Sequence, residues 1–586
     1  MKLRPALSIA LFVFLPRLAR AEDAAGPGPA ARWIPAQAVA ALEIVRPEAI
    51  LDPLLSEAAE AFVTSFPGWK ERTEEPGFRR LAGAVQMLEA RLGVDWKTAL
   101  RKLLRGGATW AVGPSGESLL VVDAESPRIL ADLHDFALGL ARAEAAKANA
   151  PERVSSEEHG GVATWTLGPE EFHAIVGNRL LLSNRREVLA RALDLRADAG
   201  PGRLEDLPAY KVSRASAPEG TAATLFVNLE RVREAPGVRE SLARGRDPMG
   251  ALLFGRLLES LRSSSWLSAA LLVDGSTVAL EAALDAPSSA DSGAIAFAAP
   301  PSGAAAAPNF AVPRAIAAWT LWRDLAGFYA KKDDLFPERT SGLIFFENMM
   351  GIFFSGMHLA DEVFAELGPE IRTVVAAQEY DPEVGEPEIR LPAFAFVFRM
   401  KNPAKFAPIA EEAWQKAIGL VNFTRGQQAL PGMILGKRSH AGREFTVAAF
   451  RPPEEKGPLD ARFNFSPSIA VAGENLILSS TAGLAKDLIA DLEGGPPAPS
   501  PSAAPPPAPG TDFLLELRGR PLRDLLEANR ANLVRQNMVE KGHTQAEAER
   551  EIGLLLELAG RVRCLKLSSA ATEGRTKARL ELEIEP

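Results

Sequence analysis

The chain has 586 residues, of which 47% are hydrophobic, and a formal charge of −9 at pH 7. That length and composition are sufficient to bury sizeable cores. Lysine and arginine are scattered among acids instead of forming the basic stripe that binds phosphates, so nucleic acid is not an expected partner.

The first 21 residues resemble a secretory signal peptide. Lys2 and Arg4 precede the apolar run at residues 6–15, and Ala19 and Ala21 form a small-x-small cleavage pattern. The run is about half the length a bilayer requires, so cleavage is favoured over a membrane anchor. We therefore expect export to the periplasm or the cell exterior, with the formal charge falling from −9 to −13 once the four basic residues of the segment are removed.

The rest of the chain offers no transmembrane span, because no other apolar stretch reaches 18 residues without interruption. Cys564 is the single cysteine, which excludes an intramolecular disulfide and an acylated cysteine at the cleavage site. Its surroundings predict a strand with a buried thiol.

Along residues 31–285 the periodicities predict helices first and then mostly strands. Apolar spacing predicts helices at 47–66, 78–92, 96–104, 127–148 and 185–195. Alternating segments predict strands at 108–112, 119–123, 162–167, 172–176, 179–183, 224–229, 267–274 and 277–284. Short connections between consecutive strands favour antiparallel pairing, so the predicted fold class is α+β.

The same pattern recurs in the second half of the chain. AIVGNRLLLSN at residues 174–184 reappears as AVAGENLILSS at 470–480, an offset of 296. Four further segments repeat in the same order, at offsets of 278, 263, 276 and about 298 to 300. Gly177 and Gly473 both stand first in a two-residue hairpin turn, a position that favours positive φ. We therefore expect two tandem copies of one module with an antiparallel sheet and packed helices.

The module boundaries follow from composition. The first copy spans residues 31–285, a low-complexity linker spans 286–307, and the second copy spans 308–586. A Pro/Ala-rich insert at 494–510 interrupts the second copy and favours an extended polyproline II conformation.

Several short motifs together resemble a family of exported bacterial proteins catalogued as domain of unknown function 3352. They are WIPA at residues 33–36, LGVD at 92–95, GGA at 106–108 and GNRLLLS at 177–183, together with the signal peptide. The resemblance covers most of both copies. It implies export, and it brings with it no catalytic residue, cofactor or activity.

Known catalytic motifs are missing from the sequence. There is no GxSxG elbow, SxxK, HExxH, GxxxxGK or GxGxxG motif, so no catalytic or cofactor-binding residue is assigned and no cofactor is expected. His358, Asp361 and Glu362 stand at helical spacing and could meet one metal ion. Because the first copy has Asp95, Thr98 and Ala99 there, a solvated helix start is favoured and no metal site is assigned.

The clearest difference between the copies lies at residues 343–357. Gln86, Glu89 and Arg91 of the first copy correspond to Met349, Ile352 and Phe354, so the second-copy helix is apolar nearly all round. Burial of the extra face within the protein is the leading interpretation. A partner surface or an apolar ligand groove is the alternative, with candidate residues Phe345, Phe346, Met349, Met350, Ile352, Phe353 and Phe354.

Three functional hypotheses remain from the sequence. The first is a non-enzymatic binding or scaffold protein of the cell envelope, whose partner is an unknown protein or apolar ligand. The second is a carrier of an apolar ligand such as a lipid. The third is an enzyme with an unfamiliar site, which a cleft containing titratable groups with shifted pKa values would favour.

Overall fold

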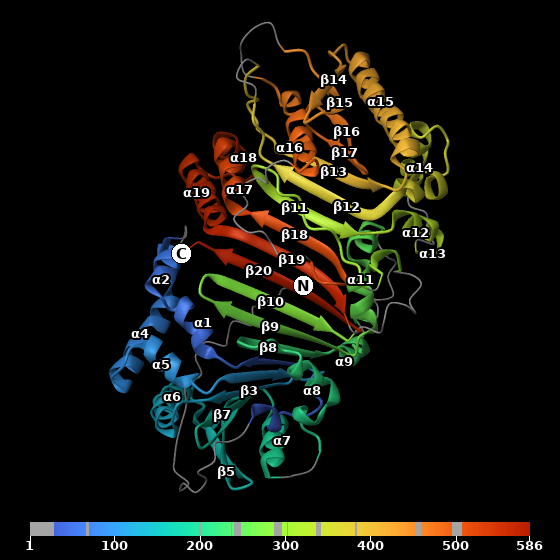
Figure 1. Ribbon diagram of the computed structural model, residues 1–586. Coiled ribbons are helices and arrows are strands. Elements are labelled where there is room, and N and C mark those ends of the chain that lie inside the picture. Colours follow the sequence, from blue (N-terminus) through green and yellow to red (C-terminus); the bar gives the residue numbers. More distant parts are fainter. Residues whose placement is uncertain are drawn as a thin grey trace. The chain divides into compact units, whose positions relative to one another are not determined.

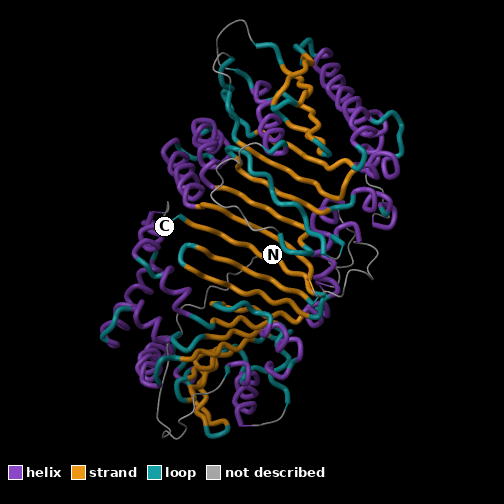
Figure 2. The backbone as a smooth tube through the Cα atoms, in the orientation of Figure 1, coloured by secondary structure: helices purple, strands orange, loops and turns teal. Residues whose placement is uncertain are grey.

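The computed structural model describes residues 29–65, 69–197, 201–235, 237–238, 248–285, 296–301, 303–335, 341–380, 384–452, 459–494, 507–572 and 574–585. The signal segment and most of the Pro/Ala-rich insert lie outside these residues. Contacts divide the chain into two compact units. Figure 1 labels their helices and strands, and Figure 2 colours the chain by secondary structure. The first contains residues 1–243, 264–275 and 280–284, and the second contains residues 244–263, 276–279 and 285–586.

The first unit is built around an antiparallel sheet. Its strands lie in the order β4–β5–β6–β7–β3–β2–β1–β8–β9, and β10 pairs with β9. The bounds are β1 Ala40–Ile44, β2 Ala108–Val112, β3 Ser118–Asp123, β4 Ser155–His159, β5 Val162–Gly168, β6 Glu171–Val176, β7 Arg179–Ser183, β8 Thr221–Asn228, β9 Trp266–Asp274 and β10 Thr277–Leu284.

Helices cover both faces of this sheet. Leu189 and Leu193 pack into a core on the face of Val121 and Leu181, whereas Leu133 packs into another core on the opposite face. Proline at the first position favours the starts of α1, α4, α6 and α8, since its missing N–H costs nothing there. The bounds are α1 Pro47–Leu54, α2 Glu57–Ser65, α3 Trp69–Glu74, α4 Pro76–Leu92, α5 Trp96–Leu103, α6 Pro127–Lys147, α7 Arg186–Ala197, α8 Pro208–Ala215 and α9 Leu229–Glu234.

The second unit has the strand order β14–β15–β16–β17–β13–β12–β11–β18–β19–β20, again antiparallel. The order is the same as in the first unit when strands are matched in chain order, with β11 as the counterpart of β1 and β20 as the counterpart of β10. The bounds are β11 Ala315–Trp322, β12 Leu367–Ala376, β13 Ala393–Met400, β14 Ile434–His440, β15 Arg443–Ala449, β16 Ser468–Ala472, β17 Asn475–Ser479, β18 Thr511–Arg518, β19 Val562–Thr572 and β20 Arg575–Ile584.

The helices of the second unit also divide between the two faces. Leu484 and Leu488 of α16 pack into a core with Ile477, and Phe406 and Ala410 of α15 pack into another with Leu476. The bounds are α11 Pro248–Ser263, α12 Leu325–Ala330, α13 Lys332–Leu335, α14 Ser341–Phe353, α15 Pro403–Gln427, α16 Ala482–Leu492, α17 Gly519–Ala528, α18 Arg530–Lys541 and α19 Gln545–Arg561.

Residue pairing repeats at the offsets found in the sequence. In the first unit, Leu119 pairs with Ala111 on one side and with Ser183 on the other. In the second, Ala395 pairs with Val374 and with Ser479, which corresponds to offsets of 276, 263 and 296. Both hairpin glycines take positive φ, 62° at Gly177 and 56° at Gly473.

The first aligned segment differs from the sequence alignment by one residue. Ala41 pairs with Ala111, and Ala318 pairs with Val374, so the offset at this strand is 277 and not 278. A one-residue slip exchanges the two faces of a strand, so the register decides which side chains are equivalent.

The predicted α+β class is correct, but several local predictions need correction. Strand β1 precedes the helices that were expected to come first, and the single helix predicted at 47–66 is two helices, α1 and α2. Helix α11 belongs by its contacts to the second unit, although it lies in the first copy by sequence. In the stretch expected to be a linker, Phe297 and Ala298 are buried.

Candidate functional site

Helix α14 exposes a group of large apolar side chains to solvent. The exposed fractions are 65% for Phe345 and 68% for Ile352, and Ile344 and Phe346 are also exposed. These residues come from the segment that the sequence singled out. The leading interpretation from the sequence was that the additional apolar face of this helix is buried within the protein. That prediction is wrong for Phe345 and Ile352, which are exposed.

The other side of this segment packs inward. Met350, Phe354 and Met357 contact the core formed around Phe406 and Leu476 of the same unit. The helix therefore has two apolar sides, one packed against its own unit and one in solvent.

Glu347, the charge that interrupts the apolar run, ties α14 to its neighbours. Its Oε1 accepts hydrogen bonds from the Tyr329 hydroxyl at 2.7 Å and from Lys332 Nζ at 2.6 Å. The Lys332 ammonium also lies 4.1 Å from the centroid of the Tyr329 ring. Partial burial, followed by the bond to Glu347, raises the pKa of Tyr329. These contacts fix the orientation of the helix and hence which side is exposed.

The seven residues predicted from sequence thus fall into three groups. Phe345, Phe346 and Ile352 are exposed, Met349 and Phe353 are half-buried, and Met350 and Phe354 pack against the core. Ile344 belongs to the exposed group and was missed, although it lies in the same apolar run. Phe354 follows the last residue of the helix, which ends at Phe353.

A buried pair of histidines in the first unit was not predicted. His134 of α6 and His173 of β6 are each fully buried, and the Trp165 ring lies 5.0 Å from that of His134. Burial lowers the pKa of His173 to about 3, and burial followed by the charge of His173 lowers that of His134. Both rings are therefore neutral at pH 7. Each histidine stands alone in the sequence, and only the fold brings the two together.

The second unit has no histidine at these positions. Trp165 pairs with His173, and the equivalent pair is Thr446 with Ile469. Ala410 takes the place of His134 at the offset of 276. The fold does not need the two imidazoles, so they are a specific feature of the first unit.

A small hollow opens beside Tyr210 in the first unit. The Tyr210 hydroxyl donates a hydrogen bond to Glu43, and Arg214 Nη2 lies 3.5 Å from the second carboxylate oxygen of Glu43. Burial, reinforced by the Glu43 carboxylate, raises the pKa of Tyr210. Because both oxygens of Glu43 have partners, this carboxylate is a positioned structural group and a poor general base.

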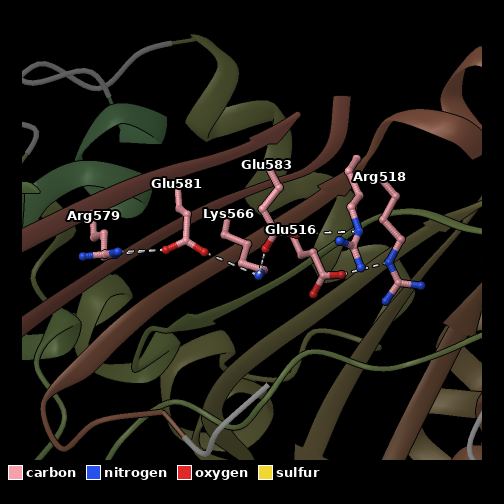
Figure 3. A network of polar contacts seen from close by, with 7 residues as sticks. Glu516, Arg518, Lys566, Arg579, Glu581 and Glu583 are labelled. Atoms are coloured by element: carbon pink, nitrogen blue, oxygen red, sulfur yellow. Dashed lines mark hydrogen bonds and ion pairs between the residues drawn. The ribbon is translucent and has the colours of Figure 1, made fainter. Parts of the chain in front are cut away.

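The equivalent sheet face of the second unit carries charges instead (Figure 3). Lys566 lies 2.5 Å from Glu583 and 3.5 Å from Glu581, and Glu581 also binds Arg579 at 2.9 Å. The position of Phe226, which packs against Tyr210 in the first unit, is occupied by Glu516, which pairs with Arg518. In the first unit, helix α8 covers this face of the sheet. In the sequence of the second copy, the Pro/Ala-rich insert stands in place of the segment that contains α8, and the same face carries charged side chains.

His358, Asp361 and Glu362, the possible metal ligands considered from the sequence, lie at the start of the short helical segment Leu359–Val363 and do not converge on one point. His358 Nδ1 lies 2.9 Å from Asp361, but Glu362 accepts a hydrogen bond from the backbone N–H of His358. Among the described residues, no group of three or more His, Cys, Asp or Glu side chains could hold a metal ion. Among the same residues, no helix has the length and apolarity needed to cross a membrane.

Comparisons with known proteins give little further information. No protein-family model and no curated protein matches the chain. Among solved structures, crystal form I of TP0453 aligns with a TM-score of 0.24 and 10% identity, over 44% of this chain and 78% of that one. Crystal form IV aligns with a TM-score of 0.22 and 9% identity, over 43% and 78%.

Proposed function

We propose that the protein is an exported, non-enzymatic binding protein of the cell envelope, built from two copies of one module. The observation that carries the proposal is the exposed apolar side of α14, where Phe345 and Ile352 are each about two-thirds in solvent. Exposed aromatic side chains on a helix held rigidly by its other side are typical of a contact surface.

The identical strand order of the two units supports the duplication. Five collinear sequence repeats and the matching residue pairs at offsets of 263, 276 and 296 have one economical cause, which is a shared ancestral module. The two copies then diverged in their buried histidines and in α14.

Export is tested at the amino terminus. Protein isolated from the envelope fraction of the native host should begin near Glu22, after the small-x-small pattern. Recovery of the chain with Met1 intact from the cytosol would refute export.

The contact surface is tested with a matched pair of substitutions. Phe345→Arg places a charge where the side chain already meets solvent, so the protein should fold normally and lose association or bound ligand. Phe354→Arg places the charge against the core and should prevent folding of the second unit. Denaturation and sizing of both variants distinguish these outcomes. Unchanged association of a folded Phe345→Arg protein would count against the proposal.

A carrier of an apolar ligand remains the alternative, because the same exposed aromatic residues could hold a lipid. Organic extraction of the purified protein followed by mass spectrometry tests it. A stoichiometric lipid that disappears in the Phe345→Arg variant would favour the carrier over a protein-binding role.

A further inference from the structure

Three charged side chains are buried together in the second unit, where α11 meets the strands β11 and β18 (Figure 1). Arg256 comes from α11, Arg323 directly follows β11, and Asp512 is the second residue of β18. The exposed fraction is 8% for Arg256 and 2% for each of the other two residues. We call these three residues the buried charge cluster. It contains two guanidinium groups and one carboxylate.

The Asp512 carboxylate and the Arg323 guanidinium are engaged by their neighbours. Arg323 Nε donates a hydrogen bond to the Leu252 carbonyl, and Nη2 donates one to the Leu253 carbonyl. Arg323 Nη1 lies 3.5 Å from Asp512 Oδ2. Asp512 Oδ1 accepts a hydrogen bond of 2.6 Å from the Ser569 hydroxyl. The single carboxylate of the cluster is therefore already paired with one of the two cations.

Arg256 is the cation that this pairing leaves over. Its Nη1 atom is buried and has no hydrogen-bond partner among the described residues. Burial lowers the pKa of Arg256, and the charge of Asp512, which also acts on Arg323, opposes that shift only in part. A buried charge without a partner is strongly destabilising. The cluster thus contains one positive charge more than its own carboxylate can balance.

Two buried hydroxyl groups lie on the same side of α11 as the Arg256 guanidinium. Ser260 follows Arg256 by four residues, which places both side chains on one face of the helix. Ser260 Oγ lies 2.8 Å from Thr576 Oγ1 of β20, and both residues are 4% exposed. One hydroxyl donates to the other, so the accepting hydroxyl still has a proton to donate. An arginine N–H and a hydroxyl O–H are therefore available as donors in this buried region.

The first unit has apolar residues at the equivalent positions. Strands β8 and β18 each have a bulge at the same point of their pairing, and the extra residues are Ala222 and Asp512. The first residue paired after the bulge is opposite Leu271 in the first unit and opposite Ser569 in the second. Ala222 is fully buried, so the bulge forms without a charge. The fold does not require the acid and its serine partner, which are specific to the second unit.

We propose that the second unit binds one small monovalent anion, of the size of chloride, between Arg256 and the hydroxyls of Ser260 and Thr576. One negative charge balances two guanidinium groups and one carboxylate. Arginine N–H and hydroxyl O–H groups are hydrogen-bond donors, which is the chemistry that an anion requires. The anion has to be small, because an arginine that is 8% exposed meets its ligand inside the protein. The exposed side of α14 takes no part in this site, so the two proposals are independent.

Bromide tests the site directly, because it resembles chloride and scatters X-rays anomalously. Crystals of the full chain grown with bromide should show one anomalous peak within hydrogen-bonding distance of Arg256 Nη1 and of the Ser260 or Thr576 hydroxyl. A map without a peak at this place would overturn the proposal. So would an equally strong peak at the same place in crystals of the Arg256→Met variant.

Linkage in solution measures how many anions bind. Chloride replaces gluconate at constant ionic strength, and the protection of α11 amides from hydrogen exchange reports the opening of this unit. Above the dissociation constant, protection should rise about tenfold for each tenfold increase in chloride, as expected for one ion that binds only the folded state. Protection that is independent of chloride would overturn the proposal.

A matched pair of variants assigns the chloride response to Arg256. In chloride-free buffer, Arg256→Met should be more stable than the unmodified protein, because it removes a buried charge without a partner. Its amide protection should not depend on chloride. Arg535→Met removes the same charge from a side chain of α18 that is 64% exposed, and it should keep the full response. An Arg256→Met protein that is less stable in chloride-free buffer, or that still responds to chloride, would overturn the proposal.

Discussion

The imidazole rings of His134 and His173 lie edge to face inside the first unit, with centroids 5.2 Å apart and planes at 75°. One ring comes from α6 and the other from β6, so the pair joins the helix layer to the sheet. Both positions are apolar in the second unit, where Ala410 and Ile469 belong to the core on the equivalent face. The two units should therefore respond differently to pH.

Acidification should destabilise the first unit. The folded pKa of each histidine lies below the unfolded value of about 6.5, so the unfolded chain binds more protons as the pH falls through that value. The free energy of unfolding should therefore be independent of these groups above pH 6.5. It should fall by up to about 1.4 kcal/mol per histidine per pH unit below it, until the folded histidines themselves take up protons.

The second unit supplies the control variant. His134→Ala/His173→Ile installs the residues found there, and urea denaturation at a series of pH values should show a shallower loss of stability between pH 6.5 and about 4. Identical pH profiles for this variant and the unmodified protein would show that other groups control the acid response.

Truncation should affect stability differently on the two sides of the α14 segment. Phe354→Ala removes a half-buried ring that contacts the core and should cost about 2 to 3 kcal/mol, less than for a fully buried phenylalanine. Ile352→Ala removes a side chain that is 68% exposed and should change stability by less than about 0.5 kcal/mol. Chemical denaturation monitors both. Equal costs would mean that the helix is oriented differently.

Arg323 and Arg46 occupy equivalent positions in the two units, and Arg323 should contribute more to stability. In the second unit, its guanidinium donates to the carbonyls of Leu252 and Leu253 at 2.6 and 2.7 Å and lies 3.5 Å from the buried Asp512 carboxylate. Arg323→Met leaves these groups without their partner and should cost about 3 to 5 kcal/mol.

Arg46 is the matched control, because it is 277 residues earlier and bonds the Gly220 carbonyl from an exposed position. Arg46→Met should cost less than about 1 kcal/mol. Comparable losses in the two variants, measured by guanidinium denaturation, would contradict the assignment of Arg323 as a buried structural cation.

The thiol of Cys564 should be unreactive in the folded protein. It is buried in β19, and burial followed by the charge of Glu516 raises its pKa to about 11. At pH 8 the thiolate fraction is then small, and alkylation by iodoacetamide should be much slower than in denaturant. Fast modification of the native protein would indicate that β19 opens readily.

Local periodicity was enough to predict much of the fold. The alternation of apolar residues located most strands, and the repeat around Gly177 and Gly473 predicted two similar hairpins, since a positive-φ turn requires glycine at that point. Strand β4 was missed because its sequence, SSEEH, has no apolar face and pairs at a sheet edge. Nor could local pattern show that α11 belongs to the second unit, because that depends on contacts distant in sequence, such as Arg323 with Leu252.

The candidate site was predicted only in part. Composition located the apolar segment, but the orientation of α14 depends on Tyr329 and Lys332, which bind Glu347 from earlier helices. Without those contacts, nothing in the segment distinguishes the exposed Phe345 from the packed Phe354. The histidine pair depends likewise on the packing of α6 against β6.

Site-specific photocrosslinking in the native host tests the proposed contact surface most directly. A benzophenone side chain replaces Phe345 in one strain, and Val539, which is apolar and 85% exposed on α18, in the control strain. If α14 is the contact surface, irradiation should yield a discrete adduct with one partner from position 345 and none from position 539. The absence of an adduct at position 345, or equal labelling from both positions, would contradict the account.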